Sequence, residues 1–263
     1  MKEKEAGRPT PTLSHRAEYA SMRALIAGLG KLDWDTACGI GEQLGELGFR
    51  PLGIRRHVVE TQIAAAFPDK DSAWVAQTAR ASYRHLGRNA VEAALISDRG
   101  PAGVLDLVES VEEWEHIEAA VAGGQAAIGV AAHHGNWEML GGFLAAKGLA
   151  PEVVVRGMGN RMFEEYLNEN RRKLGLLVVS DKVAVRHMTK SLREGKFFCL
   201  LADQGVLGLA SSFVPFFGMP AKTPRGFAVF GLRLDVKVTF MDMLRLPNGK
   251  FRAVFEPVGV ERT

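Results

Sequence analysis

Cysteine is scarce in this sequence and lies in no motif. Cys38 and Cys199 are its two cysteines among 263 residues, and nothing in their surroundings suggests a partner pattern. A disulfide framework is therefore excluded. Cys199 lies inside an apolar run, and both side chains are expected to be reduced thiols, which is typical of a protein that faces the cytosol.

Long apolar runs and a charge excess are also lacking. No segment reaches the roughly 18 uncharged apolar residues that a membrane-spanning helix requires. The balance of 33 Lys and Arg against 30 Asp and Glu gives a net charge of +3, which is too small to predict a nucleic-acid partner. Residues 1–11 are polar and have no signal-peptide core, so we predict a disordered tail over residues 1–12.

The apolar content is sufficient for a large core. Hydrophobic residues make up 47% of the chain, which predicts one domain overall. Residues 13–100 show helical patterns broken by glycines and no strong strand pattern. From residue 101 to 263, short apolar runs alternate with helical stretches. This alternation predicts an α/β fold, in which a helical N-terminal part precedes a mostly parallel sheet flanked by helices.

The elements of the α/β part can be placed by residue number. We predict strands at 104–108, 126–132, 152–155, 176–179, 197–202 and 236–241. We predict helices near 112–123, 137–147, 161–174, 183–194 and 224–233. The turn Pro247-Asn248-Gly249 predicts a terminal hairpin that joins 238–245 to 250–256.

The candidate active site follows the uncharged run at 126–132, which suits a strand buried on both faces. The sequence continues through His133 and Gly135 to Asn136, which is placed to cap a helix. Glu138 falls in the first turn of that helix, where the helix dipole favours a carboxylate. An imidazole and a carboxylate are thus expected at the carboxyl end of a strand, where open α/β sheets bind ligands.

His133 and Glu138 are the candidate acid–base pair. A neutral histidine is a competent general base near pH 7 when a carboxylate holds its tautomer. His134 is not expected to share this task, because adjacent residues at a strand end point to opposite faces. The same geometry disfavours a metal site, and none is predicted. From the residues alone, a turn-capping His133 and a dipole-complementing Glu138 remain an alternative.

A second strand end supplies further candidates. Leu200–Gly205 takes an apolar run into a polar corner, and this places Asp203 and Gln204 at the same sheet edge if the strands are parallel. Asp203 could orient the base or the acceptor, although a loop aspartate in an Asx-turn is an equal alternative.

The aromatic stretch Ser211–Gly218 has two interpretations. Phe213, Phe216 and Phe217 alternate with other apolar residues there. Such a cluster is typical of a core, which is the first expectation. The alternative is the wall of an apolar channel, for which Phe216 and Phe217 are the candidate residues.

Arginines supply candidate anion sites. A phosphate or a phosphopantetheine group could be held by any of several: Arg156, Arg161, Arg171, Arg172 and Arg225. On the helix predicted at 71–96, Arg80, Arg84 and Arg88 share one face. That face could meet anionic lipid head groups or an acidic carrier protein, whereas an ordinary solvated surface is the first expectation.

Four stretches together resemble one protein family. H-H-G-N-W-E at 133–138 is similar to the H-x-x-x-x-(D/E) signature of the bacterial lipid A biosynthesis (lauroyl and myristoyl) acyltransferases and related mannoside acyltransferases, in the lysophospholipid acyltransferase superfamily. TQIAAAFPDKD at 61–71, LLADQG at 200–205 and SSFVPFFGMPAKTPRG at 211–226 fit the same family in order.

The resemblance implies a glycerolipid-acyltransferase-like fold and transfer of a fatty acyl group to a glycolipid hydroxyl. It makes His133 the base and Glu138 its partner. It also supports a site position for Asp203 without fixing its role, and Asp203 is the third catalytic candidate. The acyl donor would be an acyl carrier protein or coenzyme A thioester, and no cofactor is implied. The acceptor would be a glycolipid such as a lipid A precursor. The candidate substrate-binding residues are Asn136, Arg156, Arg171, Gln204, Phe216, Phe217 and Arg225.

The resemblance also implies a location. The protein is expected at the cytoplasmic face of the bacterial inner membrane, in peripheral contact with it. Family members normally continue through a C-terminal segment rich in Trp, His and Arg, so we expect a C-terminally short member. An acyl-thioester hydrolase and a non-catalytic lipid-binding protein of the same fold remain alternatives.

Overall fold

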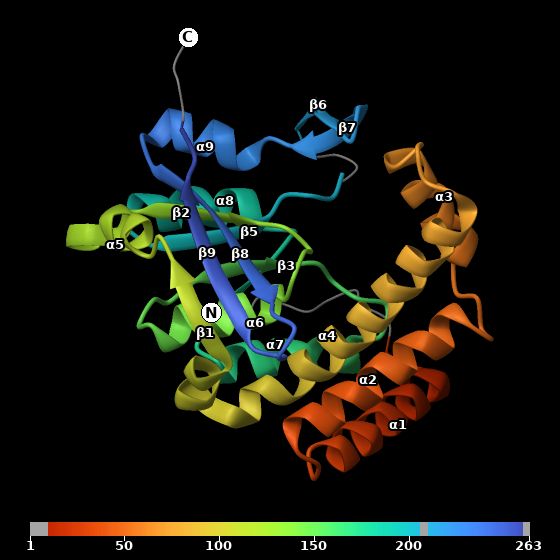
Figure 1. The fold of residues 1–263 in the computed structure, drawn as a ribbon. Helices are drawn as coiled ribbons and strands as arrows, with labels where there is room; N and C mark the ends of the chain where they lie inside the picture. Colours follow the sequence, from red (N-terminus) through yellow and green to blue (C-terminus); the bar gives the residue numbers. More distant parts are fainter. Residues whose placement is uncertain (1–9, 206–209, 260–263) are drawn as a thin grey trace.

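The computed structural model describes residues 10–205 and 210–259. Within them the chain forms a helical N-terminal part followed by a mostly parallel sheet with helices on both faces (Figure 1), so the predicted fold class is confirmed. The helices are α1 (Leu13–Leu29), α2 (Trp34–Phe49), α3 (Arg56–Ala66), α4 (Ser72–Leu107), α5 (Glu115–Val121), η1 (Ala122–Gly124), α6 (Trp137–Ala146), α7 (Arg161–Lys173), α8 (Ala184–Arg193) and α9 (Gly226–Leu234).

The large sheet has seven strands in the order β1-β9-β8-β2-β5-β3-β4. Its strands are β1 (Val108–Glu112), β2 (Ala127–Ala131), β3 (Glu152–Val155), β4 (Leu177–Ser180), β5 (Phe197–Leu201), β8 (Lys237–Arg245) and β9 (Phe251–Pro257). The five strands β8, β2, β5, β3 and β4 run parallel, whereas β9 pairs antiparallel with β8. The carboxyl ends of β2 and β5 therefore meet at one edge of the sheet.

Two apolar layers fix the helices on the sheet. One layer packs α4, α5 and α6 against one face, with Phe143, Phe251 and Phe255 at most 1% exposed. The other layer packs α8 and α9 on the opposite face, around Ile128 and Phe198. All five residues of β2 are buried because this strand lies in the middle of both layers, as the uncharged run predicted.

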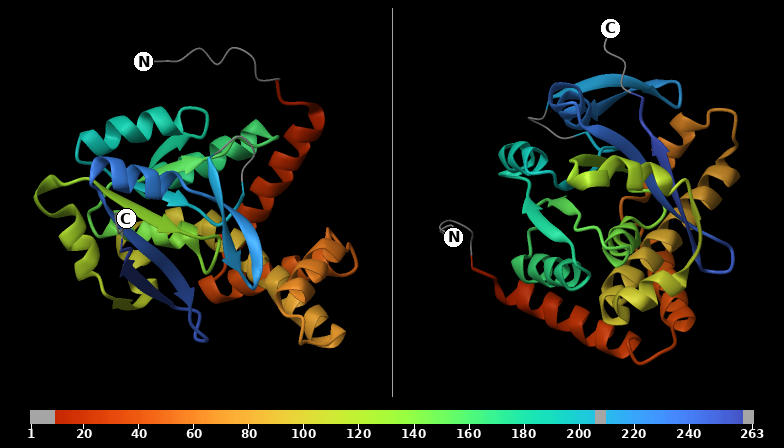
Figure 2. Two further views of the ribbon diagram at one scale, coloured as in Figure 1. Left: turned by 90° about the horizontal axis from the view of Figure 1, so that it is seen from above. Right: turned by 90° about the vertical axis from the view of Figure 1, so that its left-hand side faces the viewer.

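The helical part lies beside the sheet, and α4 joins the two (Figure 2). Arginines of α4 meet carboxylates of α2: Arg80 Nε lies 2.7 Å from a Glu46 oxygen, and Arg88 Nη1 lies 2.9 Å from a Glu42 oxygen. Arg84 also binds Glu42, at 2.6 Å. The face that could meet anionic head groups, or remain simply solvated, is instead an ion-pair interface between two helices.

One element prediction is wrong, one is confirmed, and one element was not predicted. The strand expected at 104–108 is wrong over most of its length, because α4 continues through a kink at Gly100 to Leu107 and β1 starts at Val108. The terminal hairpin is confirmed as β8 and β9, with Arg245 opposite Phe251. A second hairpin, β6 (Ser211–Phe216) with β7 (Met219–Pro224), forms a separate two-stranded sheet that the sequence patterns did not predict.

In the part of the chain that the structure describes, no helix has the length and apolarity needed to cross a bilayer. Most of the tail predicted at residues 1–12 lies outside the described residues, and α1 begins at Leu13.

Candidate active site

The candidate site is built on the turn between β2 and α6. Gly135 has φ +53, and a Cβ there would lie 2.0 Å from the Met243 carbonyl oxygen. Only glycine fits this left-handed backbone and close approach. Asn136 caps α6, since its side-chain oxygen accepts from the Met139 N–H at 3.0 Å. The turn therefore packs against β8 at Gly135 and is fixed to α6 by Asn136.

His133 pairs with Asp203 across the sheet edge. Its Nδ1 lies 2.9 Å from Asp203 Oδ1, and its backbone N–H donates to Oδ2 at 3.1 Å. A carboxylate accepts only, so Nδ1 carries the hydrogen and Nε2 is the nitrogen that can take a proton. The side chains are 33% and 34% exposed. His133 is thus a solvent-accessible imidazole in a fixed tautomer.

Glu138 is held elsewhere, which corrects the pair expected from the sequence. Arg171 of α7 donates from Nε to Glu138 Oε2 at 3.0 Å and from Nη2 to Oε1. Arg171 Nη1 donates to Asn168 at 3.0 Å. This two-pronged ion pair, with side chains 16% and 19% exposed, ties α6 to α7. The carboxylate hydrogen-bonded to His133 is that of Asp203.

Asn136 also receives a different role. Its side chain is buried and its amide nitrogen donates to Glu92 Oε2 at 2.6 Å. Because both ends of this amide are engaged within the fold, the predicted substrate contact is replaced by a capping role.

A network from α4 holds the turn, and the sequence patterns did not indicate it. Asn89 Nδ2 donates to the Gly135 carbonyl oxygen at 2.7 Å, and His85 Nε2 lies 3.0 Å from the same oxygen. Glu92, which is 0% exposed, accepts from Arg245 Nε at 3.0 Å and from Arg88 Nε at 3.0 Å. Three polar residues spaced at 85, 89 and 92 are the one sequence signal that could have drawn attention to this inward face.

Burial, together with the neighbouring Arg245 guanidinium, lowers the pKa of His85. Arg245 Nη1 donates to His85 Nδ1 at 2.8 Å. Nδ1 is therefore the unprotonated nitrogen, and Nε2–H donates to Gly135. His85 is a neutral structural histidine in this arrangement.

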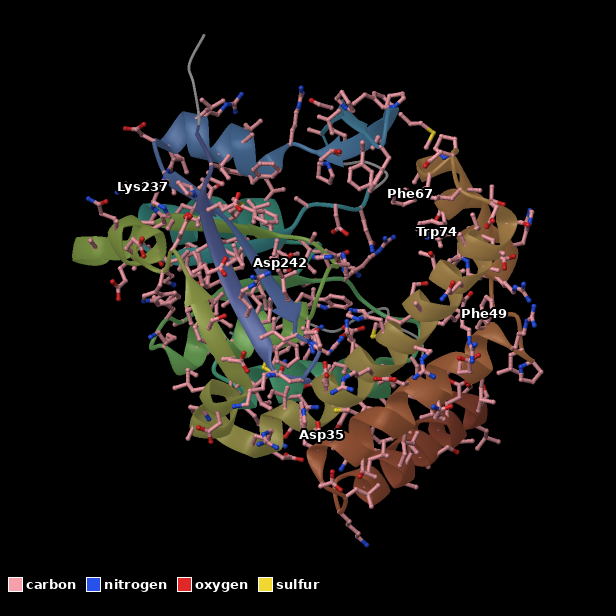
Figure 3. The ribbon with its side chains drawn as sticks, in the orientation of Figure 1. Asp35, Phe49, Phe67, Trp74, Lys237 and Asp242 are labelled. Carbon is pink, nitrogen blue, oxygen red and sulfur yellow. The ribbon has the colours of Figure 1, made fainter. Side chains whose placement is uncertain are left out.

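His134 forms a second histidine–aspartate pair on the other side of β2. Its Nδ1 lies 2.6 Å from Asp242 Oδ2, and the Met243 backbone N–H donates to Asp242 Oδ1 at 2.7 Å. Asp242 lies on β8 (labelled in Figure 3). The two histidines thus bind aspartates of different strands, one following β5 and one on β8, because these strands lie on opposite sides of β2 in the sheet.

Among the described residues, the remaining candidates form no hydrogen bond or ion pair with His133, whose partner is Asp203. Arg156 follows β3, Gln204 follows Asp203 and Arg225 precedes α9, and all three are exposed. Arg172 pairs with Glu165 at 2.8 Å on an exposed surface. Phe216 and Phe217 are 63% and 51% exposed, so the core interpretation of the aromatic stretch is wrong.

Other features of the molecule lie outside the site. Both cysteines are buried, and burial raises the pKa of Cys38 to about 12 and that of Cys199 further. A cavity of about 370 Å³ lies beside Lys237 at the amino end of β8, at the sheet edge opposite His133. Over residues 10–205 and 210–259, no group of three or more His, Cys, Asp and Glu side chains could hold a metal ion.

Comparison with known proteins finds one matching family model and two similar proteins. The family model for bacterial lipid A biosynthesis acyltransferases matches residues 12–259. Two curated phosphatidylinositol mannoside acyltransferases, from two strains of Mycobacterium tuberculosis, are each 27% identical to this chain over 150 residues. The match covers 55% of this chain and 46% of each relative, so the chain spans about half the length of the curated relatives it matches.

Proposed function

This chain belongs to the bacterial lipid A biosynthesis acyltransferase family, and we propose that it transfers a fatty acyl group from an acyl thioester to a hydroxyl of a glycolipid. The observation that carries this proposal is the His133–Asp203 pair, in which Nδ1 is bound to a carboxylate at 2.9 Å and the imidazole remains accessible. A base fixed in this tautomer is suited to removing a hydroxyl proton.

The reaction is a direct transfer. Nε2 of His133 takes the proton of the acceptor hydroxyl as the hydroxyl oxygen attacks the thioester carbonyl carbon. When the tetrahedral intermediate collapses, the carbon–sulfur bond breaks and the departing sulfur takes that proton from the imidazolium. Asp203 stabilises the imidazolium between these steps. Neither cysteine is needed as a nucleophile, and the raised pKa of both thiols agrees with an inert role.

The oxyanion of the tetrahedral intermediate needs hydrogen-bond donors, and several groups around His133 are already engaged within the fold. The backbone N–H of Asn136 donates to the Met243 carbonyl oxygen at 2.9 Å, and that of His133 donates to Asp203. All three nitrogens of the Arg171 guanidinium face Glu138 or Asn168. We therefore assign contact with the oxyanion or with a donor phosphate to Arg156, which is exposed at the carboxyl end of β3.

The donor and the acceptor are proposed by class. The donor is an acyl carrier protein or coenzyme A thioester, and the acceptor is a glycolipid such as a lipid A precursor. The similarity to phosphatidylinositol mannoside acyltransferases supports a mannosylated inositol lipid as the other acceptor to test. We place the reaction at the cytoplasmic face of the bacterial inner membrane, with the protein in peripheral contact, because both the acceptor and the product are lipids.

The test is an acyl-transfer assay read by mass spectrometry. The protein is incubated with an acyl-CoA or an acyl carrier protein thioester, with and without each glycolipid. Acylated glycolipid is expected from the parent and from the control His116→Ala, which lies on α5, whereas His133→Ala should lose at least about 10²-fold in rate.

Three results would contradict the proposal. Activity of His133→Ala near that of the parent would remove the assigned base. Free fatty acid formed equally with and without glycolipid would indicate a thioester hydrolase. Binding of lipid without any product would indicate a non-catalytic lipid-binding protein.

A further inference from the structure

The β6–β7 hairpin exposes apolar side chains on both of its faces. Phe213 is 73% exposed and the next residue, Val214, is 40% exposed. Successive residues of a strand point to opposite faces, so neither face of this ribbon is covered. Phe216 and Met219 pair with each other at its tip, and they are 63% and 45% exposed. Apolar side chains gathered in this way mark an interaction site.

The hairpin continues into aromatic residues at the end of α3 and in the first turn of α4. The rings of Phe217 and Phe67 lie 5.1 Å apart between centroids, and those of Phe67 and Trp74 lie 5.2 Å apart. Phe67 and Trp74 (labelled in Figure 3) thus extend the surface from the hairpin to the helical part. We call these residues the aromatic ridge: Phe67, Trp74, Phe213, Val214, Phe216, Phe217 and Met219.

The β6–β7 hairpin and Arg225, which follows it, carry positive charge only, whereas the α3–α4 end of the ridge is mixed, with Asp69 and Asp71 on either side of Lys70. Residues 211–225 contain Lys222 and Arg225 and no Asp or Glu. Lys70 lies 5.9 Å from the Trp74 ring and is also paired with Asp69. Lys222 and Lys70 are both exposed. Cations beside exposed aromatic rings are the combination that binds an anionic lipid surface.

We propose that the aromatic ridge inserts into the head-group region of an anionic phospholipid bilayer. A protein partner would cover one face of a two-stranded ribbon, whereas a bilayer surrounds an inserted hairpin and covers both. Aromatic side chains favour this interfacial depth, and lysines beside them reach phosphate groups. Because both faces of the hairpin are exposed and its own charge is positive, a bilayer fits this surface better than a protein partner does.

The position of the hairpin connects this surface to the candidate site. Gly205 packs so closely on β7 that a Cβ there would lie 3.0 Å from the Lys222 carbonyl oxygen. Gly205 is two residues from Asp203, the partner of His133. Docking through the ridge therefore brings the His133–Asp203 pair to the lipid surface, and this consequence rests on the proposed function.

Vesicle flotation tests the docking surface. The parent should float with vesicles of equal parts phosphatidylglycerol and phosphatidylcholine, and much less with phosphatidylcholine alone. The double variant Phe213→Thr with Val214→Thr places threonine, a polar β-branched residue that suits a strand, at both positions. It should lower the bound fraction at least about ten-fold. The matched control, Leu177→Thr with Val185→Thr, alters two exposed apolar residues on β4 and α8 and should bind like the parent.

Lys222→Glu gives a second measurement that does not depend on the hairpin's apolar residues. It should weaken flotation with the anionic vesicles and leave the weak binding to phosphatidylcholine unchanged. Unchanged flotation of the Phe213 and Val214 double variant, or no binding of the parent to anionic vesicles, would overturn the proposal. A parent dimer that dissociates when Phe213 and Val214 are replaced would assign the ridge to a second copy of the chain instead.

An assay in detergent micelles separates this inference from the proposed function. With donor and glycolipid both presented in micelles, the Phe213 and Val214 variant should keep the parent's transfer rate. If the parent shows no transfer but still floats through the ridge, the function fails and the docking surface stands. If transfer is normal and flotation is unaffected by the ridge variants, the docking surface fails alone.

Discussion

His133 Nδ1 lies 2.9 Å from Oδ1 of Asp203, although 70 positions separate the two residues. β2 and β5 are adjacent parallel strands, with Ala131 opposite Leu201. The residues that follow each strand therefore emerge side by side. The same strand pairing gives the carboxylate two contacts with His133, through the ring and through the backbone N–H.

The first prediction concerns this pair. Asp203→Asn should lower kcat for acyl transfer by about 10²-fold or more, because an amide can stabilise the wrong tautomer and cannot stabilise the imidazolium. The measurement is the steady-state rate together with a thermal unfolding curve. Asp181→Asn, at the carboxyl end of β4, is the matched control and should keep the rate. A kcat for Asp203→Asn equal to the parent's would show that Asp203 does not assist the base.

The second prediction concerns Glu138 and Arg171. Removing either partner should destabilise the protein by about 3 kcal/mol, since the other charge is left largely buried. The double variant Glu138→Ala with Arg171→Ala should cost little more than the worse single variant. Urea unfolding of the four proteins measures this coupling. Additive losses would mean that the two side chains act independently.

The third prediction concerns the buried Glu92. Glu92→Gln should lower the free energy of unfolding by about 3–5 kcal/mol, because Arg88 and Arg245 would both lose the buried carboxylate with which they pair. The control is Glu165→Gln, which breaks an exposed pair with Arg172 and should cost less than about 1 kcal/mol. Comparable losses in the two variants, measured by urea unfolding, would contradict the role assigned to the network.

The fourth prediction concerns pH and His85. Its pKa is lowered in the folded protein below the ordinary value of 6.5, so the unfolded chain binds a proton first as the pH falls. Stability should therefore decrease from about pH 6.5 downward, toward the lowered pKa of the folded state. Above about pH 7 the residue should contribute no pH dependence, because both states are neutral.

Substitution isolates this contribution. His85→Gln retains a donor for the Gly135 carbonyl oxygen and removes the titration, so the stability curve should be flatter between about pH 7 and pH 5 than that of the parent. Urea unfolding at several pH values gives the slopes. His57→Gln changes an exposed histidine on α3 and serves as the control. Equal slopes for His85→Gln and the parent would refute the assignment.

Local patterns predicted the parts of the site that depend on neighbours in sequence. The uncharged run became β2, Asn136 caps α6 as its position indicated, and Glu138 lies in the first turn. These features follow from periodicity, capping and the helix dipole, which act over a few residues. The position of Asp203 at the same sheet edge as His133 was predicted from the expectation that the strands are parallel.

Local patterns did not predict which side chains meet. Whether Asp203 or Glu138 binds His133 depends on the β2–β5 register and on the position of Arg171 in α7. The helical pattern of residues 71–96 gave no reason to expect that Glu92 would bind Arg245 on β8. The exposed state of Phe216 depends on a hairpin that stands apart from the seven-stranded sheet.

The α/β class, the histidine at the end of a buried strand and the family resemblance could all be predicted from the amino-acid sequence, because short runs with fixed spacing carry them. The tertiary structure decided the partner of that histidine, the network behind its turn and the exposure of the aromatic hairpin. Those contacts join residues far apart in the chain, and their formation depends on strand order, register and helix docking, which no local pattern encodes.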